Sequence, residues 1–505
     1  MSAARRKGSR KSGGGRGRRT DRQGRPWWYD LVSTSIRSPV VDNQHAIFTN
    51  RTLRFDKVKA VGFDFDHTLA VYNTEMLDGL AMRLVIDRLI EHESFPREWF
   101  EDLPDLSFAR KGLIVDIKLG NVLKTDRYGH VLHAYHGPTK LTARQKRETY
   151  GDADVIPHVT EGMRFLQMDS AFAMPETCIY SGLAPKIEAG GYEKLWKVIR
   201  KHTDMVHRDG SLKSVITASP LDYLHVDPHT EHLLRWLRAN GKKVFLLTNS
   251  EWSYTCAMMN PTLGRLGGPE ETSWLELFDQ VIVLARKPGY FKRSNPAPPS
   301  TQGIAPHVMQ EGNILELEER LGVRGPNVLY VGDHIYADLI SSKRNTYWRT
   351  MLIVPELEEE LTVQSALPGM VQQLKETDER RTITEREVMH WKSIESSLDR
   401  LPLDEEHAEL LTRLKDECLA SRKQAMKTLN QFIRQRERLR SRLSLATNPH
   451  WGSLFRAGNE LTYFGRQLED FACTYTSRAT NLSFYPPNHY FRSAMDYLPH
   501  ELESV

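Results

Sequence analysis

Short runs of consecutive apolar residues recur between residues 59 and 354, separated by segments in which apolar residues repeat at a helical period. Each run is apolar almost throughout, whereas a strand with one solvated face would alternate apolar and polar residues. Such strands, alternating with helices, are typical of a parallel sheet covered on both faces. The sequence therefore predicts an α/β fold with a doubly wound parallel sheet, whose strands lie within residues 59–72, 243–250, 280–284, 327–333 and 350–354.

The stretch between the first two runs has a different pattern, so residues 75–225 are predicted to be inserted after the first strand. Helical periods predict helices at 75–92 and around 175–187 and 193–207. Two apolar stretches, 112–117 and 130–135, flank the turn sequence at 126–129 and predict a β-hairpin. A further helix is expected to begin at Asp227-Pro228, with Asp as cap and Pro in the first turn.

The C-terminal third of the chain changes character twice. Residues 365–445 are charged and helical, and Leu401-Pro402-Leu403 interrupts them, which predicts a long helical hairpin. The last sixty residues are rich in aromatic side chains, so we expect this segment to pack on the core. A long loop is predicted between Pro288 and Gly312, with prolines at 296, 298 and 299.

Composition and cysteine usage are those of an ordinary globular protein. The 505 residues are 40% hydrophobic and 27% charged, which allows two or three domains. No run is apolar and long enough for a membrane span or a secretory signal, and we expect a cytoplasmic protein with no membrane partner. The four cysteines lie far apart without a CxxC pair and are expected to be reduced: Cys178, Cys256, Cys418 and Cys473.

Positive charge is concentrated at the start of the chain. The formal net charge is +4, yet residues 1–25 hold ten basic residues and one acid, Asp21. The rest of the chain is therefore weakly acidic. The basic segment is rich in Gly and Ser, which is typical of disorder, and Trp27, Trp28 and Tyr29 are expected to mark where packing begins. The segment can attract nucleic acid or another polyanion, although a solvated leader without a partner is the simpler interpretation.

Polar residues follow four of the predicted strands: Asp64 and Asp66, Thr248 and Asn249, Lys287, and Asp333 with Asp338. Carboxyl ends of parallel strands meet at one edge of a sheet, where ligands bind. Each residue also has a simpler interpretation: Asn249 as a helix cap, Lys287 as a surface cation, Asp333 as a loop acid. The agreement of four successive strand ends favours a common site over these alternatives.

This set of residues predicts phosphoryl transfer. Asp64 can attack phosphorus and form an aspartyl-phosphate, and Asp66 can give a proton to the leaving oxygen and later activate water. Thr248 and Asn249 can donate hydrogen bonds to phosphoryl oxygens, and Lys287 can neutralise their charge. The acids Asp64, Asp66, Asp333 and Asp338 are predicted to hold Mg²⁺, which prefers oxygen ligands. A zinc site at His225, His229 and His232 is disfavoured, because no cysteine or carboxylate lies at zinc-ligand spacing.

Longer motifs extend the pattern from about residue 50 to residue 502: Gly62–Tyr72, Phe245–Ser250, Ala285–Pro288, Tyr330–Asp338, Trp348–Thr350, Val354–Leu357, Gly452–Gly458, Tyr485–Pro487 and Leu498–Glu501. Together they resemble the haloacid dehalogenase superfamily of phosphohydrolases, and in detail its cytosolic purine 5′-nucleotidase family. The resemblance implies a tail at 1–30, a Rossmann-like core at 31–74 and 226–360, a cap at 75–225 that covers the site, and a C-terminal helical region at 361–505.

The resemblance also implies a substrate, a nucleoside 5′-monophosphate such as IMP or GMP, and residues that bind it. Phe172 and His207 would sandwich the base, Arg200 and Asp204 would hydrogen-bond it, and Lys213 and Ser250 would lie near the phosphate. Three departures are visible: Asp169 stands near the base where an amide is expected, Arg208 replaces an aromatic residue, and Asp470, near Gln467, replaces a cation where the family binds an activating nucleotide.

Two further functions stay open at this point. A phosphatase of the same chemistry could act on another phosphate ester or transfer the phosphoryl group to a nucleoside. A non-catalytic binding protein could use the basic segment, but such a protein would have no use for Asp66, Lys287 and Asp333 together. We further expect a homo-oligomer.

Overall fold

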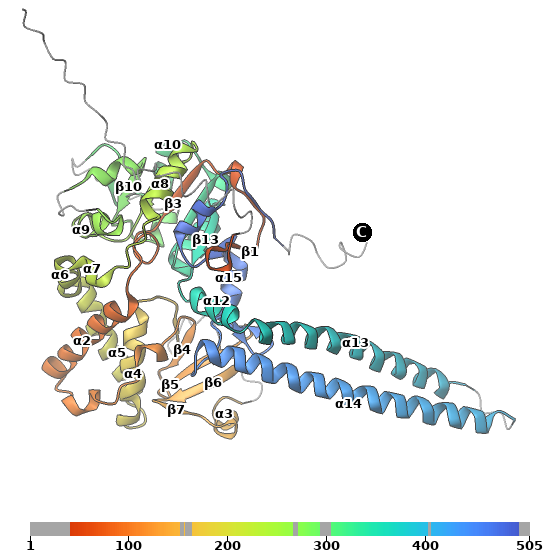
Figure 1. The fold of residues 1–505 in the computed structure, drawn as a ribbon. Helices are drawn as coiled ribbons and strands as arrows, with labels where there is room; N and C mark the ends of the chain where they lie inside the picture. The colour runs from red at the N-terminus through yellow and green to blue at the C-terminus, as the bar shows by residue number, and fades with distance from the viewer. Residues whose placement is uncertain are drawn as a thin grey trace, which may run out of the picture.

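An eight-stranded sheet forms the centre of the protein, in a computed structural model that describes residues 41–151, 156, 164–265, 271–292, 305–401 and 406–493. Its strand order is β1-β16-β13-β12-β3-β9-β10-β11 (Figure 1). The strands are β1 (Phe48–Thr49), β3 (Ala60–Phe63), β9 (Lys243–Leu247), β10 (Gln280–Val283), β11 (Val308–Gln310), β12 (Val328–Gly332), β13 (Arg349–Ile353) and β16 (Thr474–Thr476).

All pairs of neighbouring strands in this sheet are parallel except β1 with β16. The chain builds outward from β3 in both directions, first through β9, β10 and β11 and then through β12 and β13. The predicted doubly wound parallel sheet is therefore confirmed. The apolar runs had predicted five strands, whereas the short strands β1, β11 and β16 at the two edges were not recognised.

Alternate residues of the strands serve two separate cores, as the apolar runs require. In β9, Val244 and Leu246 join the cluster on one face of the sheet, whereas Phe245 and Leu247 join the cluster on the other. Gly62 in β3 is essential to this packing, because a Cβ there would lie 2.1 Å from the Phe245 ring. A side chain at residue 62 would displace the ring from the second core.

Residues between β3 and β9 form a second sheet, with the order β7-β6-β5-β4-β8 and antiparallel pairs throughout. Its strands are β4 (Leu113–Asp116), β5 (Asn121–Thr125), β6 (Val131–His136), β7 (Thr139–Lys140) and β8 (Phe165–Met168). The predicted hairpin is wrong in its pairing. The turn at 126–129 joins β5 to β6, and β4 pairs with the other edge of β5. Strand β5 was not recognised in the sequence, because it is short and contains Asn and Lys.

Helices cover both sheets, and the three predicted in the inserted segment are present as α2, α4 and α5. The helix expected at Asp227-Pro228 begins later, because the Asp227 carboxylate accepts a hydrogen bond from the His229 amide in a preceding turn. The helices of the body are α2 (Thr74–Glu93), α3 (Ala143–Tyr150), α4 (Ala173–Leu183), α5 (Tyr192–Arg208), α6 (Ser211–Ala218), α7 (Pro220–Tyr223), α8 (Thr230–Ala239), α9 (Trp252–Thr262), α10 (Ile314–Leu321), α11 (Ser341–Thr346), α12 (Leu357–Ala366) and α15 (Tyr463–Phe471).

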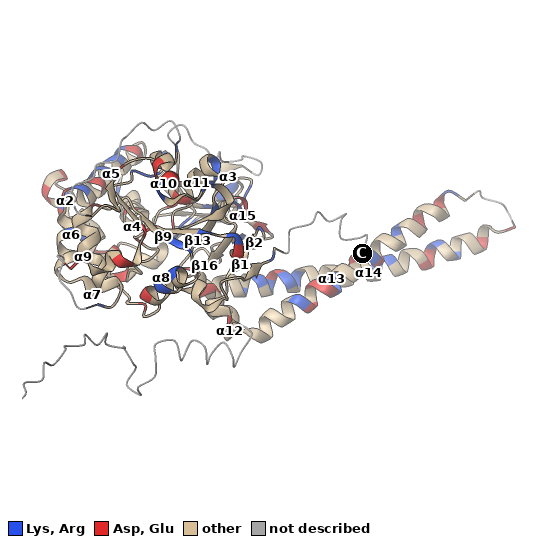
Figure 2. Cartoon of the chain, turned by 90° about the horizontal axis from the view of Figure 1, so that it is seen from above, with Lys and Arg blue, Asp and Glu red and all other residues tan. Residues whose placement is uncertain are grey.

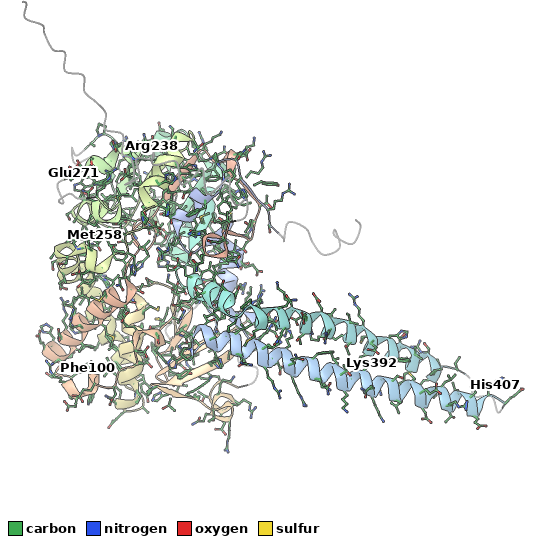
Figure 3. All side chains as sticks on the ribbon, in the orientation of Figure 1. Phe100, Arg238, Met258, Glu271, Lys392 and His407 are labelled. Carbon is green, nitrogen blue, oxygen red and sulfur yellow. The ribbon has the colours of Figure 1, made fainter. Side chains whose placement is uncertain are left out.

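A long helical hairpin projects from this body (Figure 1). It consists of α13 (Pro368–Asp399) and α14 (Ala408–Thr447), and we call it the arm. Figure 3 labels Lys392 on α13 and His407 near the outer end of the arm. The helical hairpin predicted for residues 365–445 is therefore present. No helix among the described residues has the length and apolar character that crossing a membrane requires.

The segment after α14 returns to the body and connects its two sheets. Strand β16 pairs with β13, so the aromatic C-terminal segment packs on the core as expected. The Trp451 indole is buried and donates a hydrogen bond to the Phe108 carbonyl, 2.6 Å away. The Lys124 ammonium of β5 donates to the carbonyls of Trp451 and Ser453. The second sheet is thus attached to the C-terminal segment as well as to the core.

Several sequence predictions concern residues outside the described ranges. They are the basic segment at 1–25, the aromatic residues Trp27, Trp28 and Tyr29, the prolines at 296, 298 and 299, Pro402 and Leu403, and the motif at Leu498–Glu501. The domain limits also stay predictions.

Replacing Trp451 with Ala should destabilise the protein strongly. The side chain is 2% exposed, and truncating a buried aromatic residue costs about 3–5 kcal/mol. Urea unfolding followed by circular dichroism measures the change, with Tyr128→Ala as the control, because Tyr128 is 54% exposed and its loss should cost less than about 0.5 kcal/mol. Equal losses in the two variants would contradict the role of Trp451.

Candidate active site

Three carboxylates meet at the carboxyl edge of the parallel sheet. Asp64 directly follows β3, Asp333 directly follows β12, and Asp338 lies in the helical turn Ile335–Ile340. One carboxylate oxygen of each lies within 4.8 Å of the others, in a group that could hold a metal ion. The predicted convergence of Asp64, Asp333 and Asp338 is therefore present in the structure.

Lys287 joins two of these acids. Its ammonium lies 2.9 Å from Asp64 Oδ2 and 2.7 Å from Asp338 Oδ1, and the side chain is 1% exposed. The Tyr330 hydroxyl lies 3.0 Å from the same ammonium. Lys287 follows β10 by four residues and is held from the neighbouring strand, because the Asn249 side chain accepts a hydrogen bond from its amide and donates one to its carbonyl. Lys287 is therefore a buried cation of the site and not a surface lysine.

Gly332 explains how Asp338 comes so close to the strand ends. A Cβ at residue 332 would lie 2.5 Å from Asp338 Oδ2, so a larger residue there would push the carboxylate away. The backbone amide of His334 donates to this oxygen at 3.2 Å. A glycine at the last position of β12 thus gives Asp338 its place beside Asp333.

Burial dominates the electrostatics of this cluster. It raises the pKa of Asp64 well above its usual range despite the opposing charge of Lys287. It raises the pKa of Asp333 to about 6, against the opposing effect of Lys111. The pKa of Lys287 is raised, because the carboxylates of Asp338 and Asp64 outweigh its own burial. Carboxylates in this environment are stabilised by additional positive charge.

Asp66 lies in a different set of hydrogen bonds. Its carboxylate accepts from the Tyr72 hydroxyl at 2.7 Å and from the Ser250 hydroxyl at 2.6 Å, and it is not part of the three-carboxylate group. The Tyr72 hydroxyl also contacts the Tyr254 hydroxyl at 2.9 Å. The Lys213 ammonium lies 5.0 Å from the centre of the Tyr254 ring and 3.2 Å from Glu251. Two hydroxyl donors hold the Asp66 carboxylate at the same sheet edge.

Thr248 and Asn249 follow β9 but their side chains already have partners. The Thr248 hydroxyl accepts a hydrogen bond from the Ser250 amide at 3.0 Å, and the Asn249 side chain holds the Lys287 backbone. Both contacts shape the loops around the acids. Their predicted hydrogen bonds to a phosphoryl group stay a prediction.

Lys111, which the sequence analysis did not identify, reaches the cluster from the second sheet. It precedes β4, its side chain is 4% exposed, and its ammonium lies 4.0 Å from Asp333 Oδ2 and 3.6 Å from Glu356 Oε1. Asp78 of α2 is also near, and burial raises its pKa to about 7, opposed by Lys111. A second cation, from the inserted segment, thus faces the acid cluster.

The residues expected to bind the base gather on the helices of the inserted segment. The rings of Phe172 and His207 contact each other edge to face, 5.2 Å between centroids, and His67 meets Phe172 at 5.4 Å. Because His67 directly follows Asp66, this row of rings runs from the acids to α5. The structure brings Phe172 and His207 together, but their contact leaves no room for a base between them.

Three more of the expected residues lie along the same segment. Arg200 pairs with Asp204, 3.3 Å away, and with Glu176, 2.7 Å away. Glu176 is buried in α4, and burial raises its pKa to about 7 against the opposing charge of Arg200. Asp169, just after β8, is half-buried and has one buried carboxylate oxygen without a hydrogen bond among the described residues. Burial raises its pKa to about 6.

The acid cluster has the chemistry of a magnesium site. Its donor atoms are all carboxylate oxygens, which Mg²⁺ prefers. Among the described residues, the Asp333 carboxylate has no hydrogen bond although its side chain is only 11% exposed, so it is available to a cation. Asp64, Asp333 and Asp338 therefore fit a divalent cation.

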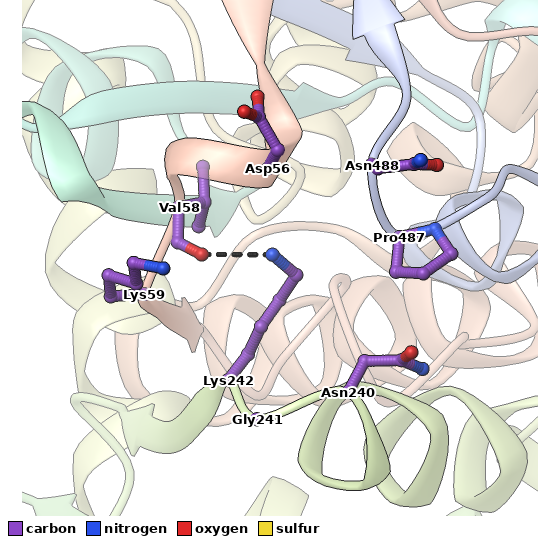
Figure 4. A pocket seen from close by; sticks show the side chains of 8 residues that line it. All are labelled: Asp56, Val58, Lys59, Asn240, Gly241, Lys242, Pro487 and Asn488. Carbon is purple, nitrogen blue, oxygen red and sulfur yellow. Dashed lines mark hydrogen bonds between the residues drawn. The ribbon is translucent and has the colours of Figure 1, made fainter.

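A cavity of about 240 Å³ lies at the opposite edge of the main sheet (Figure 4). Its lining includes Asp56, Lys59 and Lys242, which precede β3 and β9. The Lys242 ammonium donates to the carbonyls of Phe55 and Val58, at 2.7 and 2.9 Å, so its charge is already solvated by the backbone. The acids lie at the other ends of these strands, and this cavity is not part of their site.

The parallel sheet, the carboxylates and the buried lysine at its carboxyl edge are typical of enzymes that act on anionic phosphate groups. The model of the 5′ nucleotidase family matches residues 47–503, and the chain belongs to this family. It is a phosphoric monoester hydrolase. The resemblance to the nucleotidases seen in the sequence motifs is thereby confirmed.

Similar proteins include a 5′-nucleotidase domain-containing protein of Dictyostelium discoideum, 28% identical over 92% of this chain and 76% of the relative. The 5′-nucleotidase domain-containing protein 2 of Rattus norvegicus is 28% identical over 94% of this chain and 82% of its own.

Solved structures similar to the chain include a predicted phosphoglycolate phosphatase from Haemophilus somnus 129pt, 12% identical over 59% of this chain and 86% of that one, with a TM-score of 0.26. A β-phosphoglucomutase from Clostridium difficile covers 60% of this chain and 86% of its own at 11% identity, with a TM-score of 0.24. Similarity at this level carries no conclusion about substrate.

Some site residues could have been found in the sequence and others could not. His67 and Tyr72 lie within the motif at Gly62–Tyr72, and Tyr254 follows the motif at Phe245–Ser250 by four residues, in the first turn of α9. Lys111 and Glu176 carry no such signal, because a lysine before an apolar strand and an acid in a helix usually face solvent.

Removing the Lys111 charge should destabilise the protein. In Lys111→Met, Asp333 and Glu356 lose a buried counter-charge, and breaking a buried ion pair costs about 3–5 kcal/mol. Thermal and urea unfolding measure the effect. Lys197→Met is the matched control, because the pair of Lys197 with Glu193 is exposed and should contribute less than about 1 kcal/mol. A change in Lys111→Met no larger than in the control would show that Lys111 does not balance these acids.

Proposed function

We propose that this protein is a magnesium-dependent 5′-nucleotidase that hydrolyses purine nucleoside 5′-monophosphates such as IMP or GMP. The observation that supports this most strongly is the group formed by Asp64, Asp333, Asp338 and the buried ammonium of Lys287. Hydrolysis of a phosphate monoester requires a nucleophile, neutralisation of charge and a proton for the leaving oxygen. The carboxyl edge of the sheet has a candidate residue for each task.

Asp64 is the proposed nucleophile. One of its oxygens attacks phosphorus, the bond from phosphorus to the ester oxygen breaks, and an aspartyl-phosphate forms. The amide of Phe65 donates to Asp64 Oδ1 at 2.7 Å and Lys287 contacts Oδ2 at 2.9 Å, so the orientation of this carboxylate is fixed. Water then attacks the same phosphorus, which releases phosphate and restores Asp64.

Asp66 is the proposed acid and base. It gives a proton to the ester oxygen as the nucleoside leaves, and takes one from the attacking water in the second step. The hydroxyls of Tyr72 and Ser250 hold its carboxylate by donating to it, at 2.7 and 2.6 Å. Lys213 approaches this group through the Tyr254 ring and is suited to meet the outer phosphate oxygens.

Asp64, Asp333 and Asp338 would hold Mg²⁺, and Asp66 is a further predicted ligand, although its carboxylate is not part of the group that these three form. The ion would supply positive charge to the phosphoryl oxygens. Lys287 already supplies part of that charge between Asp64 and Asp338. Thr248 and Asn249 support the reaction by shaping the loop that holds Lys287 and Ser250.

The base would stack on Phe172, which is 43% exposed. Its ring contacts His67 beside the acids and His207 on α5, so a base on its outer face stays close to the reacting phosphate. Arg200, Asp204 and Asp169 then offer hydrogen-bonding groups to the base edge. Cytoplasmic location and a homo-oligomeric state remain predictions from the sequence.

A phosphatase for another phosphate ester, or a phosphotransferase with a nucleoside as acceptor, would use the same acids. The row of aromatic rings favours the nucleotidase, because a small phosphate ester has no base to stack. A panel of monophosphates, with and without an acceptor nucleoside, separates these functions. A purely non-catalytic binding protein is disfavoured by the membership of the nucleotidase family.

Asp64→Asn should abolish release of phosphate from IMP and GMP in the presence of Mg²⁺, because an amide cannot form the aspartyl-phosphate. The expected loss in kcat is at least about 10³-fold. Phosphate release is measured before and after EDTA, and EDTA should remove the activity of the unchanged protein. Asp399→Asn, at an exposed carboxylate of the arm, is the control and should keep full activity. Equal rates in the two variants would refute the assignment of Asp64.

Phe172→Ala should raise KM for IMP about tenfold, because stacking of a base on an aromatic ring contributes about 1–3 kcal/mol. Ribose 5-phosphate has the same phosphate and sugar but no base, so its KM should not change. Steady-state kinetics with both substrates measure the difference. An equal rise for the two substrates would mean that Phe172 supports the loop and does not bind the base.

A further inference from the structure

The arm buries few of its residues between its own two helices, and several apolar side chains stay exposed on it, among them Ile383, Met389, Leu410 and Leu414. The buried residues of α14 are Cys418, Ala425, Leu429 and Leu439, and those of α13 are Thr377, Thr384 and Val388. Everything else on the two helices is accessible over a length of about 48 Å for α13, at 1.5 Å per residue. A projecting element of this kind presents a large surface to a partner.

One face of α14 carries a stripe of positive charge on the half nearer to the body. We define the basic stripe as Lys423, Lys427, Arg434, Arg438 and Arg442, all exposed. Their spacings of four, seven, four and four residues keep them on one face of a helix with 3.6 residues per turn. Figure 2 shows Lys and Arg along this part of α14.

Within the described part of the chain, these five cations lack the ion-pair partners that several other basic residues of the arm have. Arg422 pairs with Glu395 at 3.2 Å, Lys415 pairs with Asp399 at 2.9 Å, and Arg436 pairs with Asp378. None of the five stripe residues forms an ion pair within the described part of the chain. The stripe is therefore a row of uncompensated charges beside a network of compensated ones.

This arrangement opposes the stability of the helix. Like charges four residues apart destabilise a helix, and the stripe has three such pairs: Lys423 with Lys427, Arg434 with Arg438, and Arg438 with Arg442. A helix face that only contacts solvent can avoid this repulsion by placing an acid four residues from each cation. The arm does so elsewhere, where Arg381 pairs with Glu385 four residues later. Repulsion concentrated on one face indicates a ligand that carries the opposite charge.

The residues around the cations distinguish between kinds of ligand. The other exposed residues from 423 to 442 are mainly Asn, Gln and Ser, with one acid, Glu437, and one apolar residue, Met426. A protein partner would be expected to use a cluster of aromatic or apolar anchors, whereas Met426 is the single exposed apolar residue in this stretch of α14. Insertion into a membrane needs a free apolar face, but that of α14 is packed against α13. Phosphate oxygens, by contrast, accept hydrogen bonds from Arg, Lys, Asn, Gln and Ser alike.

We propose that the basic stripe of α14 binds the phosphate backbone of a nucleic acid. The stripe spans residues 423–442, about 28 Å at 1.5 Å per residue, and this length matches a run of several nucleotides. Contacts to the phosphate backbone carry no sequence information, so the proposed binding depends on charge and not on sequence. This proposal does not rest on the hydrolase activity, since the stripe belongs to the arm and the acid cluster to the sheet.

Fluorescence anisotropy with labelled single-stranded RNA, single-stranded DNA and duplex DNA tests the proposal on the full chain. The test variant combines Lys427→Gln, Arg434→Gln and Arg438→Gln. The matched control combines Lys375→Gln, Arg386→Gln and Lys392→Gln, which remove the same charge from exposed positions of α13. All three proteins keep residues 1–25, so the contribution of that basic segment is the same in each.

The test variant should bind at least about tenfold more weakly at 100 mM salt, and the slope of log K against log salt should fall by about 2 for a single strand. The control should bind like the unchanged protein. Tighter binding of one nucleic acid identifies the ligand. Equal losses in both variants, or no binding by the unchanged protein, would overturn the proposal. So would equally tight binding of poly-glutamate or of anionic lipid vesicles. Circular dichroism verifies that the variants are folded.

Discussion

Repulsion among buried carboxylates is the constraint around which the centre of this protein is organised. Carboxylate oxygens of Asp64, Asp333 and Asp338 lie within 4.8 Å of one another at the edge of the sheet, where burial raises the pKa of Asp64 and of Asp333. Two buried lysines contact the group: Lys287, from the loop after β10, and Lys111, from the inserted segment. Their positive charge offsets the repulsion among the carboxylates.

Both sheets and the C-terminal segment help to place positive charge beside the three carboxylates. The parallel register of β12, β3, β9 and β10 places the acids, the Ser250 loop and Lys287 at one edge. The second sheet contributes Lys111, and the segment after α14 holds that sheet through Lys124 and Trp451. Trp451 and Lys124, which lie far from the acids, can thus affect them, because any shift of the inserted segment also moves the buried ammonium of Lys111.

The two regions of strong charge differ in how that charge is balanced. At the acid cluster, oppositely charged side chains face each other inside the protein, so the site favours a small ionic ligand that completes the balance. On the basic stripe of the arm, like charges face solvent without partners among the described residues, so the surface favours an extended ligand. The acid cluster is therefore suited to a reaction on a bound anion, and the basic stripe is suited to binding a long polyanion.

The sequence by itself determined the parts of the molecule that depend on local pattern. The apolar runs identified the main parallel strands, and the polar residues after them identified Asp64, Asp333 and Lys287, because carboxyl ends of parallel strands must meet. The helical hairpin was equally visible from its charged helical period. Only the tertiary structure decided the pairing of β5, the edge strands, the hydrogen bonds of Asp66 with Tyr72 and Ser250, and the contacts of Phe172 with His67 and His207. Lys111 shows the reason: its role depends on Asp333 and Glu356, more than 200 residues away, and no local pattern carries that information.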